Sequence, residues 1–209
     1  MSYGYLDLAV TPAVKAAQAH NQSLDLGEDS GRDRPSDRFT EAEAAFIASR
    51  DSFYIATVSE TGWPYMQHRG GPVGFLKVVD DRTLGFADYR GNRQYLSIGN
   101  LSANNRASLF LMDYARRARL KIFAELKVRD VADDPELASR LASPGYRAKA
   151  ERSMLVHLKA FDWNCPQHIT PRFTEAEIAQ AVAPLRDRLQ QLEAENQTMR
   201  TKLTEMETK

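Results

Sequence analysis

Residues 65–105 read YMQHRGGPVGFLKVVDDRTLGFADYRGNRQYLSIGNLSANN, and this stretch decides the fold. Apolar runs typical of strands alternate in it with turns that contain Gly, Asn and Arg. Turns at the ends of strands present backbone N–H groups and cationic side chains at fixed positions. The stretch therefore predicts β-structure that carries a site for a phosphate group.

Strand-like segments flank this stretch on both sides. We predict a hairpin at 52–59 and 63–68, further strands at 74–79, 83–88, 106–112 and 119–129, a last strand at 154–161, and a short helix within 94–100. Six or so short strands joined by brief connections are typical of an antiparallel sheet that closes into a barrel.

Helices are predicted around the strands. Pro12 suits the first turn of a helix at 12–20, and Thr40 with Glu43 forms a capping-box pattern that begins a helix at 41–50. A further helix follows Asp134. The segment 25–37 is charged and rich in Gly and Pro, so we interpret it as a surface loop.

The composition limits the class of protein and its partners. The chain has 209 residues, with 28 Lys and Arg against 28 Asp and Glu, so no overall field attracts nucleic acid or an anionic membrane. Cys165 is the single cysteine, which excludes an intrachain disulfide and suits a reducing compartment. No run reaches the roughly 20 apolar residues of a membrane span. We expect a cytoplasmic protein without nucleic-acid or membrane partners.

The C-terminal tail, residues 173–209, has a heptad pattern. Its apolar residues are spaced alternately by four and three, and Val182, Leu189, Asn196 and Leu203 take position a. A single Asn at a favours a parallel two-stranded coiled coil, in which the flanking pairs Arg188–Glu193, Glu195–Arg200 and Lys202–Glu207 all attract. The alternative is an amphipathic helix that packs on its own domain, since Pro184 lies inside the pattern.

Three short patterns suit an anion, and each has a plainer interpretation. Arg69 precedes two glycines, which fits an anion site or a tight corner with a solvated Arg. The turn at 91–94 has Asn92 and Arg93 before a helical segment, which fits a phosphate or a simple turn. Lys77 lies in an apolar run and either pairs with a phosphate or faces water from an edge strand.

The segment 162–168, DWNCPQH, has an unusual composition for a linker and is interpreted as a site loop. Cys165 and His168 match no zinc spacing, so no metal site is expected. A Cys–His nucleophile pair ranks below a packing or ring-stacking role, and Trp163 suits a buried anchor or an aromatic wall. The chain contains none of the Walker, dinucleotide, G-x-S-x-G or H-E-x-x-H motifs.

The combined pattern resembles the pyridoxamine 5'-phosphate oxidase-like family of FMN-binding split barrels. The resemblance rests on 39–78, FTEAEAAFIASRDSFYIATVSETGWPYMQHRGGPVGFLKV, on 84–114, LGFADYRGNRQYLSIGNLSANNRASLFLMDY, and on 161–172, FDWNCPQHITPR. It implies a mainly β (α+β) fold, a six-stranded antiparallel split β-barrel with flanking helices, and a homodimer with FMN in a groove shared by the two subunits. The chain then divides into an N-terminal helix and loop (1–38), the barrel (39–172) and the helical tail (173–209).

The same resemblance implies a set of cofactor-binding residues. Gln67, His68, Arg69, Gly70 and Gly71 are expected along the flavin ring and the ribityl chain. Lys77, Asp88, Asn92, Arg93, Gln94 and Ser97 are expected near the phosphate. Trp163, Cys165, Gln167 and His168 are expected to approach the flavin, from their own chain or from the partner subunit.

The resemblance implies an FMN-dependent oxidoreductase that acts on an unidentified small molecule. His68 and His168 are the candidates for proton transfer, because imidazole titrates near neutral pH. Two alternatives stay open. One is a non-catalytic flavin-binding or sensor protein, and the other is a reductase that uses a deazaflavin on the same barrel.

Overall fold

The computed structural model describes residues 4–21, 37–163 and 166–207. Its helices and strands are α1 (Tyr5–Ala9), α2 (Pro12–His20), α3 (Glu41–Ala48), β1 (Ser52–Val58), β2 (Pro64–Gly70), β3 (Lys77–Asp80), β4 (Thr83–Tyr89), α4 (Leu96–Ala103), β5 (Arg106–Asp113), β6 (Ala118–Asp130), α5 (Pro135–Leu141), β7 (Ala150–Trp163) and α6 (Glu175–Glu207). The predicted loop at 25–37 lies almost entirely outside the described residues.

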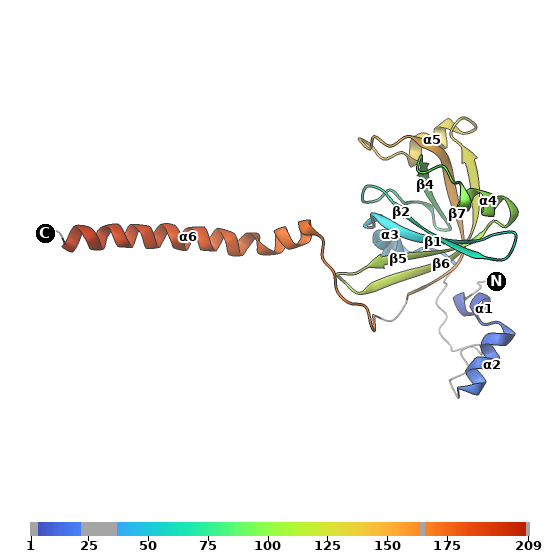
Figure 1. The fold of residues 1–209 in the computed structure, drawn as a ribbon, viewed down its shortest axis with the longest axis horizontal. Helices are drawn as coiled ribbons and strands as arrows, with labels where there is room; N and C mark the ends of the chain where they lie inside the picture. The colour runs from blue at the N-terminus through green and yellow to red at the C-terminus, as the bar shows by residue number, and fades with distance from the viewer. Residues whose placement is uncertain (1–3, 22–36, 164–165, 208–209) are drawn as a thin grey trace. The chain divides into compact units, whose positions relative to one another are not determined.

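The seven strands form one antiparallel sheet in the order β2-β1-β5-β6-β7-β4-β3 (Figure 1). The predicted mainly β fold with flanking helices is confirmed. All seven strand segments predicted from the sequence are present, and the short edge strand β3, which pairs with β4, makes the sheet one strand larger than the six-stranded barrel that the resemblance implies. Strand β7 starts four residues before the predicted start and pairs with both β6 and β4.

The sheet curls so that strands far apart in its order meet through their side chains. Phe53 on β1 packs edge to face against Phe86 on β4, with ring centroids 5.3 Å apart, although three strands separate β1 from β4 in the order. Phe75 stacks on Phe53 at 5.7 Å and also packs edge to face on Phe86 at 6.4 Å. All three rings are almost completely buried, so they form the centre of the hydrophobic core.

Helices α5 and α1 pack on the sheet through specific residues. Helix α5 packs on β4 at Gly85, where an added Cβ would meet the Leu141 side chain at 2.6 Å. Helix α1 contacts β7, and its Tyr5 ring stacks on Phe123 of β6 at 4.5 Å. Burial and the charge of Asp162 raise the pKa of Tyr5. Helices α1 and α5 thus each cover a defined part of the sheet.

Glu43 joins the start of α3 to the end of β7. Its carboxylate accepts hydrogen bonds from the backbone and side chain of Thr40, at 2.9 and 2.5 Å, and from the Trp163 indole Nε1 at 2.6 Å. Burial acts to raise the pKa of Glu43, but these hydrogen bonds outweigh it, and the pKa lies below its ordinary value. Trp163 also packs edge to face on Phe46.

The chain forms two compact units, Met1–Asp113 with Arg117–His168, and Tyr114–Arg116 with Ile169–Lys209. The first contains the sheet, and the second contains α6, the predicted helical tail. The division of the sequence at residues 38 and 172 stays a prediction. Within the described part of the chain, no helix is both long enough and apolar enough to cross a membrane.

We expect Glu43→Gln to lower the free energy of unfolding by about 1–3 kcal/mol near pH 7, because the amide accepts the Thr40 and Trp163 hydrogen bonds less well than a charged carboxylate. Since the pKa of Glu43 is lowered in the folded protein, its stabilisation is present above the ordinary value of 4.5 and is lost as the pH falls through the folded pKa. The difference between the wild type and the variant therefore shrinks in acid.

Urea unfolding over a series of pH values measures this effect. Glu41→Gln is the matched control, because Glu41 lies in the same helical turn and is exposed. The role given to Glu43 would be contradicted if both variants lost the same free energy of unfolding relative to the wild type, or if the loss for Glu43→Gln grew in acid.

Candidate functional site

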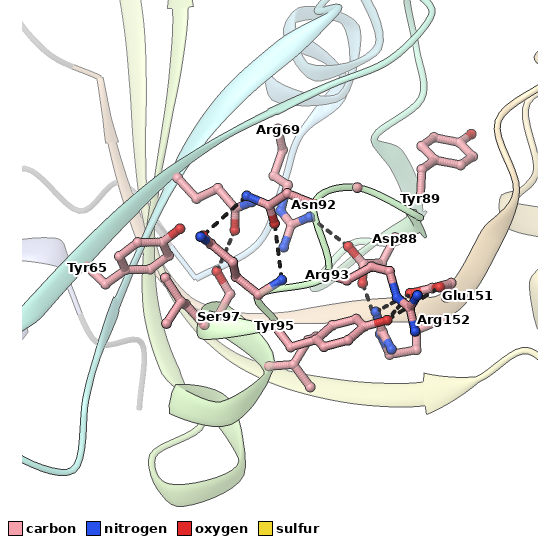
Figure 2. Close-up of a pocket in the computed structure, with 15 residues that line it drawn as sticks. Tyr65, Arg69, Asp88, Tyr89, Asn92, Arg93, Tyr95, Ser97, Glu151 and Arg152 are labelled. Atoms are coloured by element: carbon pink, nitrogen blue, oxygen red, sulfur yellow. Dashed lines mark hydrogen bonds and ion pairs between the residues drawn. The ribbon is translucent and has the colours of Figure 1, made fainter.

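A pocket opens where β2, β4, β7 and the N-terminus of α4 come together (Figure 2). Its cavity volume is about 220 Å³. Seven of the residues predicted to bind a cofactor line it: Gln67, Arg69, Asp88, Asn92, Arg93, Gln94 and Ser97. The structure therefore brings together the centre of the predicted set, drawn from two strands, one turn and one helix.

Strand β2 contributes every second residue to the pocket. Tyr65, Gln67 and Arg69 line it, whereas Met66 and His68 lie on the opposite face of the strand, because successive side chains of a strand alternate. His68 instead packs edge to face with Tyr54 of β1 at 5.6 Å. The structure thus places His68 outside the pocket of its own chain.

An ion cluster forms one wall of the pocket, as the dashed lines in Figure 2 show. Asp88 on β4 contacts Arg69 of β2 at 2.6 Å through one carboxylate oxygen and Arg152 of β7 at 2.9 Å through the other. The Asp88 side chain is only 3% exposed. Glu151 contacts Arg152 at 2.9 Å. We call these four residues the Asp88 cluster.

The charged groups of the Asp88 cluster are paired with one another, and this pairing stabilises their ionised forms. Partial burial acts to lower the pKa of Arg152, but Asp88 and Glu151 outweigh it and raise that pKa. Arg69 is less completely satisfied, because its buried Nε has no hydrogen-bond partner among the described residues. One buried N–H of Arg69, a residue that lines the pocket, is thus left without a partner in the described part of the chain.

The turn at residues 91–95 forms the opposite side and has unusual backbone geometry. Arg93 and Tyr95 have φ values of 65° and 53°, in the left-handed region that residues with a side chain rarely adopt. Asn92 fixes the turn, since its Oδ1 accepts from the Gln94 backbone N–H at 3.2 Å. The Tyr95 hydroxyl donates to Glu151 at 3.2 Å, so the turn is tied to the Asp88 cluster.

Helix α4 starts at this turn and lines the pocket with its first three residues, Leu96, Ser97 and Ile98. Its N-cap residue, Tyr95, makes no side-chain cap hydrogen bond. The Ser97 hydroxyl donates to Gln67 Oε1 at 2.8 Å and joins the helix to β2. An uncapped helix N-terminus beside an arginine is a place where an anion is stabilised.

Three predicted residues have structural contacts elsewhere. Lys77 donates from Nζ to the carbonyl oxygens of Arg140 and Ala142, at 2.9 and 2.8 Å, and so caps the C-terminal end of α5. At Gly71, an added Cβ would meet the Phe75 ring at 2.7 Å, so packing requires this glycine. Trp163 is anchored by Glu43 and Phe46.

The remaining predicted residues do not line the pocket in one chain. Gly70 ends strand β2 and is exposed. Gln167 and His168 lie in an exposed turn, and His168 has a φ of 63°. Cys165 lies outside the described residues. Roles for these residues at a cofactor, and for His68 and His168 in proton transfer, stay predictions.

Glu151 and Arg152 belong to the pocket but were not predicted from the sequence. They precede the predicted strand 154–161, yet β7 begins at Ala150 and includes them. The sequence pattern does indicate Arg152. Met154, Val156 and Leu158 are buried at every second position, and extending this alternation two residues towards the N-terminus puts Arg152 on the same face of the strand. Tyr65, Tyr89 and Tyr95 also line the pocket and were missed.

The sequence profile of the pyridoxamine 5'-phosphate oxidase family matches residues 39–163, which is more than half of the chain. The chain belongs to this family. The matched segment contains β1 to β7 and every residue that lines the pocket.

Solved structures similar to this family member were also found. A putative pyridoxamine 5'-phosphate oxidase from Lactobacillus delbrueckii has 17% identity and a TM-score of 0.47, over 60% of this chain and 94% of that one. An FMN-binding protein from Syntrophomonas wolfei has 15% identity and a TM-score of 0.44, over 57% and 81%. At such values nothing about the ligand of this chain follows from them. No match was found among curated proteins.

We expect Asp88→Asn to lower the free energy of unfolding by about 3 kcal/mol, because it leaves two largely buried arginines without their shared counter-ion. The side chains of Arg69 and Arg152 are 17% and 15% exposed. Chemical denaturation measures the change.

Asp81→Asn is the control, since Asp81 pairs with Arg38 at 2.8 Å in an exposed ion pair and should cost under about 1 kcal/mol. Equal losses for the two variants would show that the Asp88 cluster does not stabilise the fold.

Proposed function

We propose that the chain is an FMN-dependent oxidoreductase whose pocket binds the phosphate and part of the ribityl chain of FMN. The observation that carries the proposal is the uncapped N-terminus of α4, which lines the pocket together with Arg93. A helix N-terminus and a guanidinium are both favourable for a phosphate dianion. Family membership supports a flavin as the molecule that carries this phosphate.

The side chains that line the pocket are suited to binding the phosphate and ribityl chain of FMN. Arg69 has a buried Nε without a partner in the described part of the chain, and this donor suits an oxygen of the ligand. Gln67 and Ser97 form a hydrogen-bonded pair at the pocket wall that can exchange to a ribityl hydroxyl. FMN would supply the hydride chemistry when bound, while these side chains would hold and orient its phosphate and ribityl chain.

The pocket of one chain is too small for the whole of FMN. Ligand pockets for molecules of drug size usually span about 300–1,000 Å³, whereas this cavity is about 220 Å³. The remaining flavin surface needs another wall. We propose that a second copy supplies it in a homodimer with a shared groove. The exposed apolar residues Trp63 and Met66, 76% and 68% exposed, give a second copy an apolar surface to contact at or beside β2.

The identity of the chromophore tests the cofactor. We expect the purified protein to be yellow, and mass spectrometry of the released chromophore to identify FMN. A deazaflavin in its place would replace FMN in the proposal. A colourless protein that takes up neither molecule would refute it.

Redox behaviour tests the activity separately. The FMN-loaded protein is mixed with NADH or NADPH without oxygen, and flavin absorbance is followed. Bleaching by the nucleotide and recovery in air are expected of an oxidoreductase. Bound FMN that a chemical reductant bleaches but neither nucleotide bleaches would instead indicate a non-catalytic flavin-binding protein.

We expect Arg93→Gln to weaken FMN binding by about 10- to 100-fold, the loss of one charge-assisted contact to phosphate. Riboflavin lacks the phosphate, so its affinity should change by less than about twofold. Both constants are measured by quenching of flavin fluorescence. Arg106→Gln is the control, because Arg106 is exposed at the start of β5 and does not line the pocket. Equal weakening of FMN and riboflavin would remove Arg93 from the phosphate site.

A further inference from the structure

Helix α6 is 33 residues long and exposes an apolar stripe along one side. The stripe consists of Ile178, Leu185, Leu189, Leu192, Met199 and Leu203, with Met206 near its end, and their exposed fractions run from 44% to 76%. The helix as a whole is polar, with a mean hydropathy that favours water. Side chains of this kind are stabilised when they are removed from water, so the stripe requires a partner surface.

The stripe has the spacing of a two-stranded coiled coil. Counting from Leu185 as d, the d positions hold Leu185, Leu192, Met199 and Met206, and the a positions hold Leu189, Asn196 and Leu203. Pro184 falls at position c, outside the a and d set, and precedes the first of these residues. The segment 185–206 is therefore an uninterrupted helix of three heptads.

We propose that this segment pairs with the same segment of a second copy as a parallel, in-register coiled coil. In a parallel pair, a faces a and d faces d, so Asn196 meets Asn196 of the second copy and the two amides can hydrogen-bond. In an antiparallel pair, a faces d, and Asn196 would be buried against Leu or Met without a partner. The cost of an unpaired buried amide selects the parallel arrangement.

The charges beside the stripe favour the same arrangement. In a parallel pair, each g residue lies next to the e residue five positions further along the other helix. Arg188 then meets Glu193, and Glu195 meets Arg200, so both contacts join opposite charges. Residues five apart do not face each other on one helix, so neither pair can form within a single chain.

The full chain with Cys165→Ser provides the background for a crosslinking test. Leu185→Cys and Met199→Cys each place one thiol at a d position, two heptads apart, and Ala194→Cys places one at f on the far side of the helix. A parallel, in-register pair brings identical d residues together. With a mild oxidant such as diamide, both d variants should form a disulfide-linked dimer at least about tenfold faster than the f variant.

Each outcome decides between arrangements. An antiparallel pair brings identical residues together at one point at most, so crosslinking of only one d variant would overturn the parallel assignment. Equal rates for all three variants, or no crosslinking, would show that the stripe does not pair with a second copy. The test measures disulfide formation between cysteines in α6 only, so its result does not depend on flavin binding.

A charge exchange tests the register. In the Met199→Cys background, Glu195→Arg should slow crosslinking, because it sets two arginines against each other across the pair. Adding Arg200→Glu should restore the rate. Slow crosslinking that the second change does not rescue would contradict the proposed contact between positions 195 and 200.

Discussion

The carboxylate of Asp88 is the contact on which the sheet and the pocket both depend. Strands β2 and β4 are separated by four others in the order of the sheet, so no ladder of backbone hydrogen bonds joins them. Asp88 joins them through Arg69, and it also pairs across the β4–β7 ladder with Arg152, its direct partner in register. A low-dielectric setting strengthens these contacts and makes the loss of any one charge costly. Asp88 therefore holds β2 beside β4 at the pocket, and it adds to the buried contact of Phe53 with Phe86 that brings β1 to β4.

The same cluster supports the strained turn that begins α4. Left-handed residues that are not glycine cost of order 1–3 kcal/mol each, and the turn contains two of them. Tyr95 is fixed in this conformation by its hydroxyl bond to Glu151 and by the Arg152 guanidinium, which lies 4.8 Å from the centre of its ring. Cation–π contacts contribute about 0.5–2 kcal/mol, so they offset part of this strain. The result is an uncapped helix end turned toward an arginine-lined pocket, which a helix with an ordinary N-cap would not present.

The fold and the residues in the middle of the pocket could be predicted from the sequence, but the whole of the pocket wall could not. Alternating apolar residues and turn chemistry are local, so the strands and the 91–94 turn could be predicted. The consecutive set Gln67, His68 and Arg69 was assigned to one ligand, although a strand presents only every second residue to one side, and the structure accordingly separates His68 from the other two. Arg152 and the carbonyl partners of Lys77 lie more than 60 residues from their contacts, and only the assembled fold brings such groups together.

The two proposals made for this chain each require a second copy, and symmetry connects them. The cavity is smaller than the proposed cofactor, and the apolar stripe of α6 lacks a partner surface in the described chain. A parallel, in-register coiled coil has its two-fold axis along its own length, and a groove shared by two identical chains also requires a two-fold axis. A dimer has only one such axis. If the same two chains form both the coiled coil and the shared groove, the two-fold axis of the coiled coil must coincide with the two-fold axis of the barrel pair. If different chains form them, each chain has two partners and the assembly grows beyond a dimer. The tail would then set the assembly size, while the barrel pair alone would complete the cofactor groove.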